Sequence, residues 1–244
     1  MSPSRRLLLV VSVVVAAVAS GLGGWQLQRL FSRRAANQAA LEQVRVEAAD
    51  LRVETLTGPV SHRRVTVSGT YDHAREIVIR GRLLRGTPGI QIVTPLRLPG
   101  RDTLLLVNRG FVPTADAGFP ASVAPYAEPG VVSIEGVAIA VPDDGDGQPL
   151  ITPAGETWRR LDWTQLTSRF PYPVWPYYVI VTVDTGTTRD HTIRGTSLPV
   201  RIDPPPLDDG PHLSYAVQWF LIGAAALGFG LIFVRQPPPP NDLA

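Results

Sequence analysis

The sequence predicts an α+β membrane protein in which two transmembrane helices flank a mainly antiparallel, small barrel-like β domain. Residues 7–28 and 212–234 contain no Asp, Glu, Lys or Arg, and each segment is long enough for the ~20 residues that a helix needs to cross a bilayer. Between them, short segments of alternating apolar and polar residues are separated by glycine and proline. This alternation is typical of antiparallel strands with one buried face.

The charges beside the two apolar segments predict the topology. Arg235 follows the second segment, whereas Asp208 and Asp209 precede it, so the positive-inside rule places the C-terminus in the cytoplasm. Two crossings return the N-terminus to the same side and leave residues 58–206 as an extracytoplasmic domain. The first segment opposes this orientation, because arginines lie both before and after it: Arg5, Arg6, Arg29, Arg33 and Arg34. Following the second segment, we predict a multi-pass protein of the cell membrane.

A cleaved signal peptide is the alternative interpretation of the first segment. Arg5 and Arg6 would form its charged region, the apolar residues after them its core, and residues 17–19 its small-residue cleavage site. Apolar and small residues continue beyond that site as far as Trp25, and an indole ring is typical of a membrane interface. We therefore prefer a retained anchor.

Composition and motifs exclude several function classes. The chain has no cysteine and one methionine, Met1, so it lacks the thiolate and thioether ligands of the usual copper carriers. Its formal net charge is +2 and its arginines are dispersed, which argues against nucleic-acid binding. It has no P-loop, strand-linked GxGxxG, GxSxG or HExxH motif, and its histidines are too scattered to predict a metal site. We predict that it is not an enzyme.

The segments between the anchors predict one connecting helix and several strands. Residues 33–54 lack glycine and proline and carry apolar residues at helical spacing, so they predict a helix leading from the membrane. A period of two predicts strands over 64–71, 77–83, 90–94, 104–107, 131–140 and 177–183. Residues 157–170 predict a short helix, and the proline-rich residues 235–244 are expected to be disordered. Asp72 and His73 are interpreted as a turn or surface pair.

Polar and aromatic residues gather where both apolar segments meet the outer membrane face. His212, Tyr215 and Trp219 share one face of the second helix, because they are spaced i, i+3 and i+7. At the corresponding end of the first helix, Trp25 and Arg29 lie one turn apart. Interfacial anchoring explains the aromatic rings, and snorkelling explains the arginine. Anchoring does not require the histidine.

Four segments carry a resemblance to a known family. They are residues 24–29 (GWQLQR), 67–76 (VSGTYDHARE), 105–113 (LLVNRGFVP) and 212–220 (HLSYAVQWF). In these segments the chain resembles the Surfeit-locus-one family of cytochrome c oxidase assembly factors, and the resemblance is weaker over residues 115–206. It implies an assembly factor for a haem-copper terminal oxidase, acting in haem a insertion or in stabilising the catalytic subunit. The implied partners are that subunit, haem a synthesis enzymes and membrane lipid.

The resemblance and the local chemistry together indicate candidate site residues. Haem a is the candidate cofactor: His212 could ligate its iron and Arg29 could hold a propionate. The competing interpretation is that both residues only anchor the helices. Further residues are assigned to partner binding or to the family motifs: Trp25, Gln26, Asn108, Arg109, Gly110, Phe111, Tyr215 and Trp219. Arg109 is either a buried structural charge or a partner contact, and Gly69 and Gly110 are expected to be structural. A haem carrier and an adaptor domain without haem remain alternative functions.

Overall fold

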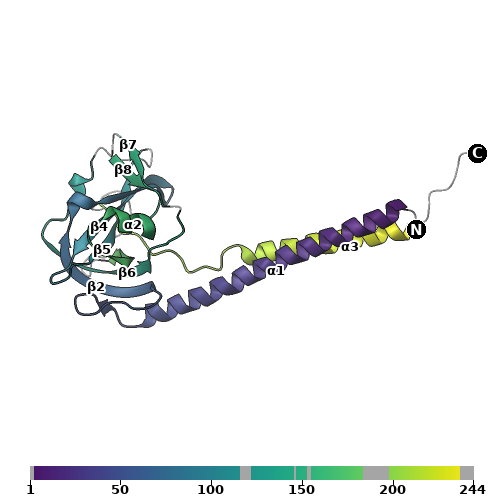
Figure 1. Ribbon diagram of the computed structural model, residues 1–244, viewed down its shortest axis with the longest axis horizontal. Coiled ribbons are helices and arrows are strands. Elements are labelled where there is room, and N and C mark those ends of the chain that lie inside the picture. The colour runs from purple at the N-terminus through teal and green to yellow at the C-terminus, as the bar shows by residue number, and fades with distance from the viewer. Residues whose placement is uncertain (1–2, 116–121, 146, 153–154, 184–197, 237–244) are drawn as a thin grey trace, which may run out of the picture. The chain divides into compact units, whose positions relative to one another are not determined.

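The computed structural model describes residues 3–115, 122–145, 147–152, 155–183 and 198–236. The chain divides into two compact units, one formed by Met1–Ala39 with Leu207–Ala244 and the other by Ala40–Pro206. The first unit is a pair of helices and the second is a β domain (Figure 1). Residues 237–244, most of the predicted disordered tail, lie outside the described residues, as does His191.

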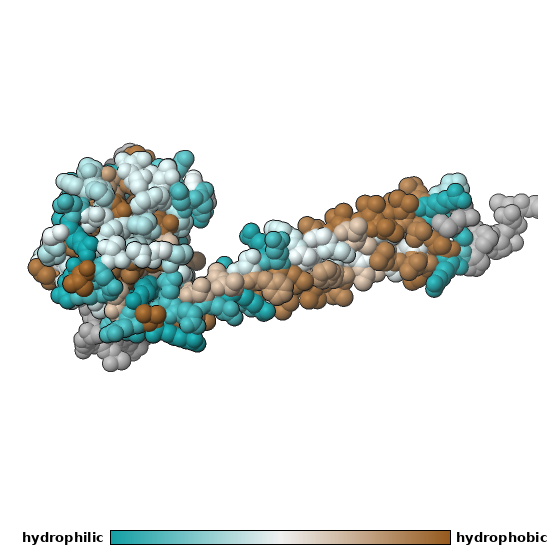
Figure 2. Space-filling view, turned by 60° about the horizontal axis from the view of Figure 1, so that its bottom comes forward, coloured by the Kyte–Doolittle hydropathy of each residue, from teal (hydrophilic) through white to brown (hydrophobic). Residues whose placement is uncertain are grey.

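The helical unit consists of two antiparallel helices with small residues between them. α1 spans Pro3–Arg45 and α3 spans His212–Arg235, and both are long and apolar enough to cross a membrane. A Cβ added to Gly230 would lie 2.7 Å from Ser12, and one added to Gly23 would lie 2.8 Å from the Phe220 ring. The backbones therefore approach closely, as in membrane helix pairs. Hydrophobic side chains cover much of the exposed surface of the helix pair, and polar ones gather towards its two ends (Figure 2).

The predicted connecting helix over 33–54 is wrong in its extent. α1 is continuous from the first apolar segment and ends at Arg45, well before Glu54. Beyond it, Ala49 pairs with Val65 in a short parallel ladder, and Leu51 is fully buried in the core of the β domain. Tertiary packing thus overrides the helical spacing of these apolar residues.

The β domain is a mixed sheet of nine strands within the described residues. The strands are β1 (Ala49–Asp50), β2 (Ser61–Tyr71), β3 (Ile77–Leu84), β4 (Thr87–Arg97), β5 (Leu104–Pro113), β6 (Val131–Ala140), β7 (Leu150–Thr152), β8 (Gly155–Trp158) and β9 (Val174–Val183). Their order is β1-β2-β6-β9-β5-β4-β3-β8-β7, and β2 also pairs with β4. All six predicted strands are confirmed. The β1–β2, β3–β8 and β5–β9 pairs are parallel, which the prediction of a mainly antiparallel sheet did not anticipate.

The central strand β5 divides the core. Leu105 and Val107 pack in one hydrophobic cluster, while Leu104 and Leu106 pack in another, because successive side chains of a strand point to opposite faces. The strand is buried on both faces, as its continuous apolar sequence predicts. Any polar side chain that follows on β5 must therefore find its partners inside the protein.

The predicted helix over 157–170 is only half present. α2 spans Trp163–Arg169 and begins where the Asp162 side chain accepts a hydrogen bond from the Gln165 amide at 3.1 Å. The residues before it form β8, because Thr157 pairs with Val78 of β3. Trp158 and Leu166 are both buried.

Candidate functional site

Arg109 is the extra residue of a β-bulge in the middle of the β domain. Gly110 pairs with Ile92 and Asn108 pairs with Val93, so Arg109 has no partner on β4. A bulge redirects the side chain that it carries. The Arg109 side chain is fully buried, although Arg is rarely buried without a charged partner. The surrounding carboxylates explain how the domain accommodates this charge.

Two of the segments that carry the family resemblance meet around Arg109. Its Nη1 donates to Glu76 Oε1 at 2.8 Å, and its guanidinium lies 5.2 Å from the centre of the Tyr71 ring. His73 begins the short 3₁₀ turn η1 (His73–Arg75), and its Nδ1 lies 2.7 Å from the same Glu76 oxygen. Thr94 also donates to this oxygen, at 2.9 Å. The interpretation of His73 as a turn residue is confirmed, and it belongs to this cluster.

Glu128 and Arg201 complete the cluster, and the sequence analysis missed both. Arg109 Nη2 lies 3.1 Å from Glu128 Oε1 and also donates to the Tyr126 carbonyl. Arg201 donates to the Arg109 carbonyl at 2.5 Å and lies 3.4 Å from Glu128 Oε2. Burial raises the pKa of Glu128, but Arg201 and Arg109 more than offset this effect, so its pKa lies below the ordinary value. Two guanidinium groups thus balance two carboxylates; we call these four residues and His73 the Arg109 cluster.

The residues that follow Arg109 on β5 make close backbone contacts with the segment around Val200. Gly110 has φ +128°, and a Cβ there would lie 2.2 Å from the Val200 carbonyl oxygen. Phe111 exchanges two 2.8 Å backbone hydrogen bonds with Val200, which fastens the segment before α3 to β5. Asn108 Oδ1 accepts the Gly110 N–H at 3.1 Å. Gly69 is also closely packed, since its Cβ would lie 2.4 Å from the Arg97 carbonyl oxygen.

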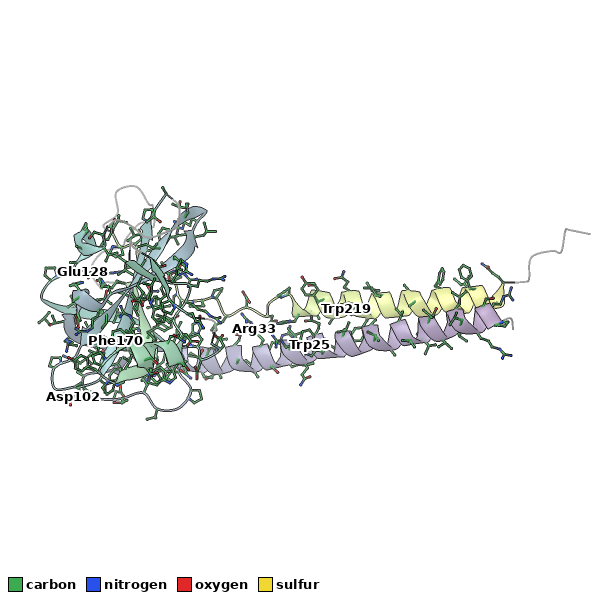
Figure 3. The ribbon with its side chains drawn as sticks, turned by 45° about the horizontal axis from the view of Figure 1, so that its top comes forward. Trp25, Arg33, Asp102, Glu128, Phe170 and Trp219 are labelled. Carbon is green, nitrogen blue, oxygen red and sulfur yellow. The ribbon has the colours of Figure 1, made fainter. Side chains whose placement is uncertain are left out.

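The helix pair carries a second group of predicted residues. His212 Nδ1 lies 2.9 Å from Gln26 Oε1, which joins α3 to α1. The Arg29 guanidinium lies 5.5 Å from the centre of the Trp25 ring; among the described contacts, none joins Arg29 to His212. Trp25 projects from α1 and Trp219 from α3 (Figure 3). The structure therefore brings His212 to Gln26, a pairing that the sequence analysis did not anticipate.

Two ion pairs join α1 to the segment directly before α3. Arg33 lies 3.3 Å from Asp208, and Arg34 lies 2.8 Å from Asp209. Asn37 adds a hydrogen bond of 2.8 Å to the Asp208 carbonyl. About half of each charged side chain is exposed, so each pair stabilises the contact by about 1 kcal/mol or less. In the sequence these charges indicate the topology, whereas their pairing becomes visible only in the structure.

These features define a class of protein with two potential membrane helices and a mixed β domain built around a buried ion cluster. Within the described residues, no group of three or more His, Asp or Glu side chains could hold a metal ion.

The comparison with known proteins identifies the family. The model of the SURF1 family matches residues 13–224, a range that includes parts of both helices and the whole β domain. A SURF1-like protein of Monosiga brevicollis is 27% identical over 253 residues, covering 92% of this chain and 90% of the relative. A SURF1-like protein of Drosophila melanogaster is 26% identical, covering 87% and 73%. Surfeit locus protein 1 of Mus musculus is 29% identical over 120 residues, covering 41% and 38%. The chain belongs to the SURF1 family, which confirms the resemblance.

Proposed function

We propose that this protein is a membrane-anchored assembly factor for a haem-copper terminal oxidase and acts on the catalytic subunit during cytochrome c oxidase biogenesis. The observation that carries the proposal is the SURF1 family match over residues 13–224, because the family is that of cytochrome c oxidase assembly factors. The match includes the helix pair and the Arg109 cluster together. The protein acts by binding and positioning, and not by catalysing a reaction.

We place both helices across the cell membrane, with both termini in the cytoplasm and the β domain outside. The ion pairs support this orientation, because Arg33 and Arg34 are each paired with an aspartate. They are two of the three arginines after the first segment that oppose the positive-inside rule, the third being Arg29. With both paired, that end of the helix pair retains Arg29 as its excess cation, whereas Arg5, Arg6 and Arg235 lie at the other end.

We also infer that the strands β2, β6, β9, β5 and β4 act as a small barrel. The support is the additional pairing between β2 and β4, through which these five strands return to their starting point. Closing a sheet in this way removes exposed strand edges. It also supplies a rigid frame for the Arg109 bulge.

Haem a insertion is the specific role that we favour, and His212 supplies the observation for it. Its Nδ1 lies 2.9 Å from Gln26 Oε1, so Nε2 is the ring nitrogen that remains for an iron, and a hydrogen bond to the other ring nitrogen orients a histidine that ligates a metal. A haem bound there would supply the iron and the propionates. His212 would provide an axial ligand and Arg29, held beside Trp25, would provide a cation for a propionate. A haem carrier and an adaptor domain without haem are the competing functions.

Deletion of the gene tests the proposal. Membranes of the deletion strain should contain less haem a in the oxidase, measured by the reduced-minus-oxidised absorption spectrum, and the complete chain should restore it. Unchanged oxidase content would overturn the assembly function. A Soret band on the purified, detergent-solubilised protein, lost in His212→Ala, would distinguish a haem carrier from an adaptor.

A further inference from the structure

A small cavity lies beside Asn108, on the β domain and apart from the Arg109 cluster. Its volume is about 80 Å³, and its polar lining comes from Arg82, Gln91, Asn108, Arg160 and Tyr178. A single water needs roughly 10–15 Å³ on a comparable measure. The cavity therefore has room for several waters or for one small oxyanion.

The cavity has an excess of positive charge. Arg82 donates from Nη2 to the Arg159 carbonyl at 2.7 Å, while its buried Nε has no hydrogen-bond partner among the described residues. Arg160 is paired with Asp144 at 2.5 Å, and no carboxylate belongs to the described residues that line the cavity. Burial lowers the pKa of Arg82, and an interaction with Tyr178 opposes this shift without cancelling it. A half-buried cation whose Nε is out of contact with solvent gains from a negative partner.

The other polar groups present donors rather than acceptors. Asn108 Oδ1 already accepts the Gly110 N–H at 3.1 Å, and Gln91 Oε1 accepts from Asn108 Nδ2 at 3.0 Å. Burial also raises the pKa of Tyr178, so its hydroxyl stays protonated and can donate at neutral pH. Donors around an uncompensated guanidinium favour an anion and disfavour a metal cation.

We propose that this cavity binds a small oxyanion, either phosphate or a carboxylate group, with Arg82 as its charge partner and Tyr178, Gln91 and Asn108 as hydrogen-bond donors. Bidentate recognition of such groups is the property that distinguishes arginine from lysine. The inference does not depend on the oxidase function, because it concerns only the chemistry of the β domain. Asn108 would link the site to the Arg109 bulge, since its side chain also holds the Gly110 amide.

The test is the thermal unfolding of the complete, detergent-solubilised chain with increasing phosphate or acetate, compared with chloride at equal ionic strength. A ligand that binds only the folded state raises the unfolding midpoint in a saturable way, and we expect this for the wild type. Arg82→Gln should weaken the apparent affinity about tenfold or more, because a charge-assisted hydrogen bond is lost. The midpoint of the variant without added anion serves as its own baseline, since the substitution also removes the hydrogen bond from Arg82 Nη2 to the Arg159 carbonyl.

Arg64→Gln is the matched control, because Arg64 also lies on a strand but is about half exposed and paired with Glu135. It should keep the full response to the anion. Tyr178→Phe removes only a hydroxyl and should weaken the response to the anion, to a level between those of the wild type and Arg82→Gln. If Arg82→Gln does not fold, Tyr178→Phe alone tests whether the cavity binds the anion. A response to phosphate alone would indicate a phosphate ligand, and a response to acetate would indicate a carboxylate. An absent response in the wild type, or one unchanged in Arg82→Gln and Tyr178→Phe, would overturn the proposal.

Discussion

The Arg109 guanidinium and the Glu76 carboxylate lie 2.8 Å apart, and their side chains are 0% and 5% exposed. They come from two separate family motifs and meet because the bulge on β5 directs Arg109 towards the turn before β3. Such a pair contributes little net free energy relative to an apolar pair, but loss of one partner leaves the other buried without compensation. The pair therefore makes the fold depend on both motifs.

Arg109→Ala should destabilise the β domain by about 3–5 kcal/mol, because the carboxylates of Glu76 and Glu128 would lose their shared partner. The free energy of unfolding of the solubilised protein in urea measures this effect. Arg64→Ala removes an arginine from an exposed pair and should cost about 1 kcal/mol or less. Equal costs for the two variants would show that Arg109 is not a structural charge.

Gly110→Ala should lower the free energy of unfolding by about 1–3 kcal/mol. The new Cβ would have an unfavourable φ and would meet the Val200 carbonyl oxygen at 2.2 Å. Gly81→Ala is the control, since Gly81 also has a positive φ, of +69°, but has open space around its Cβ position. The Gly110 variant should be the less stable and the less abundant of the two. Full abundance with lost oxidase assembly would instead place Gly110 at a partner surface.

Acid should weaken the Arg109 cluster through Glu128. The pKa of Glu128 is lower in the folded state than its ordinary value of 4.5, so its contribution to stability is present above that value and is lost as the pH falls towards the folded-state pKa. Glu128→Gln removes this contribution. The difference in unfolding free energy between wild type and Glu128→Gln should be largest near neutral pH and should shrink below about pH 4. A constant difference across this range would contradict the expected role of the carboxylate.

His212→Ala and Arg29→Ala should leave membrane insertion and protein level unchanged while lowering mature haem a in the oxidase. Gln26→Leu should have a similar but smaller effect, because it removes the group that holds His212 Nδ1 at 2.9 Å. Gln28→Ala changes an exposed residue of the same helix and serves as the control. Wild-type haem a content in all three test variants would show that these residues only anchor the helices.

The proposed topology predicts that an export-dependent reporter fused after Gly100 is active, whereas one fused after Arg235 is inactive. The physical reason is the arginine at the end of α3 together with the neutralisation of Arg33 and Arg34 by aspartates. Mass spectrometry of the mature protein checks the retained N-terminus. A mature chain that starts at Ser20 would identify the first segment as a signal peptide.

The candidate site was only partly predictable. The motif around Arg109 was visible in the sequence, but Glu128 and Arg201 were not, because they lie 19 and 92 residues away along the chain and have no periodic signal of their own. The bulge was equally hidden, since it appears only when β4 and β5 are paired. His212 was recognised through its place on the helix, whereas its pairing with Gln26 depends on the register between two helices.

The sequence by itself determined the two apolar helices and the six predicted strands, because the period of the hydrophobic residues is a local property that each segment carries alone. Only the tertiary structure decided the parallel pairing of β5 with β9, the end of α1 at Arg45 and the partners of Arg109. Those outcomes depend on which distant segments compete successfully for the same buried surface and hydrogen bonds. A buried charge is the clearest case, since its position is stable only after remote carboxylates have been brought within about 3 Å.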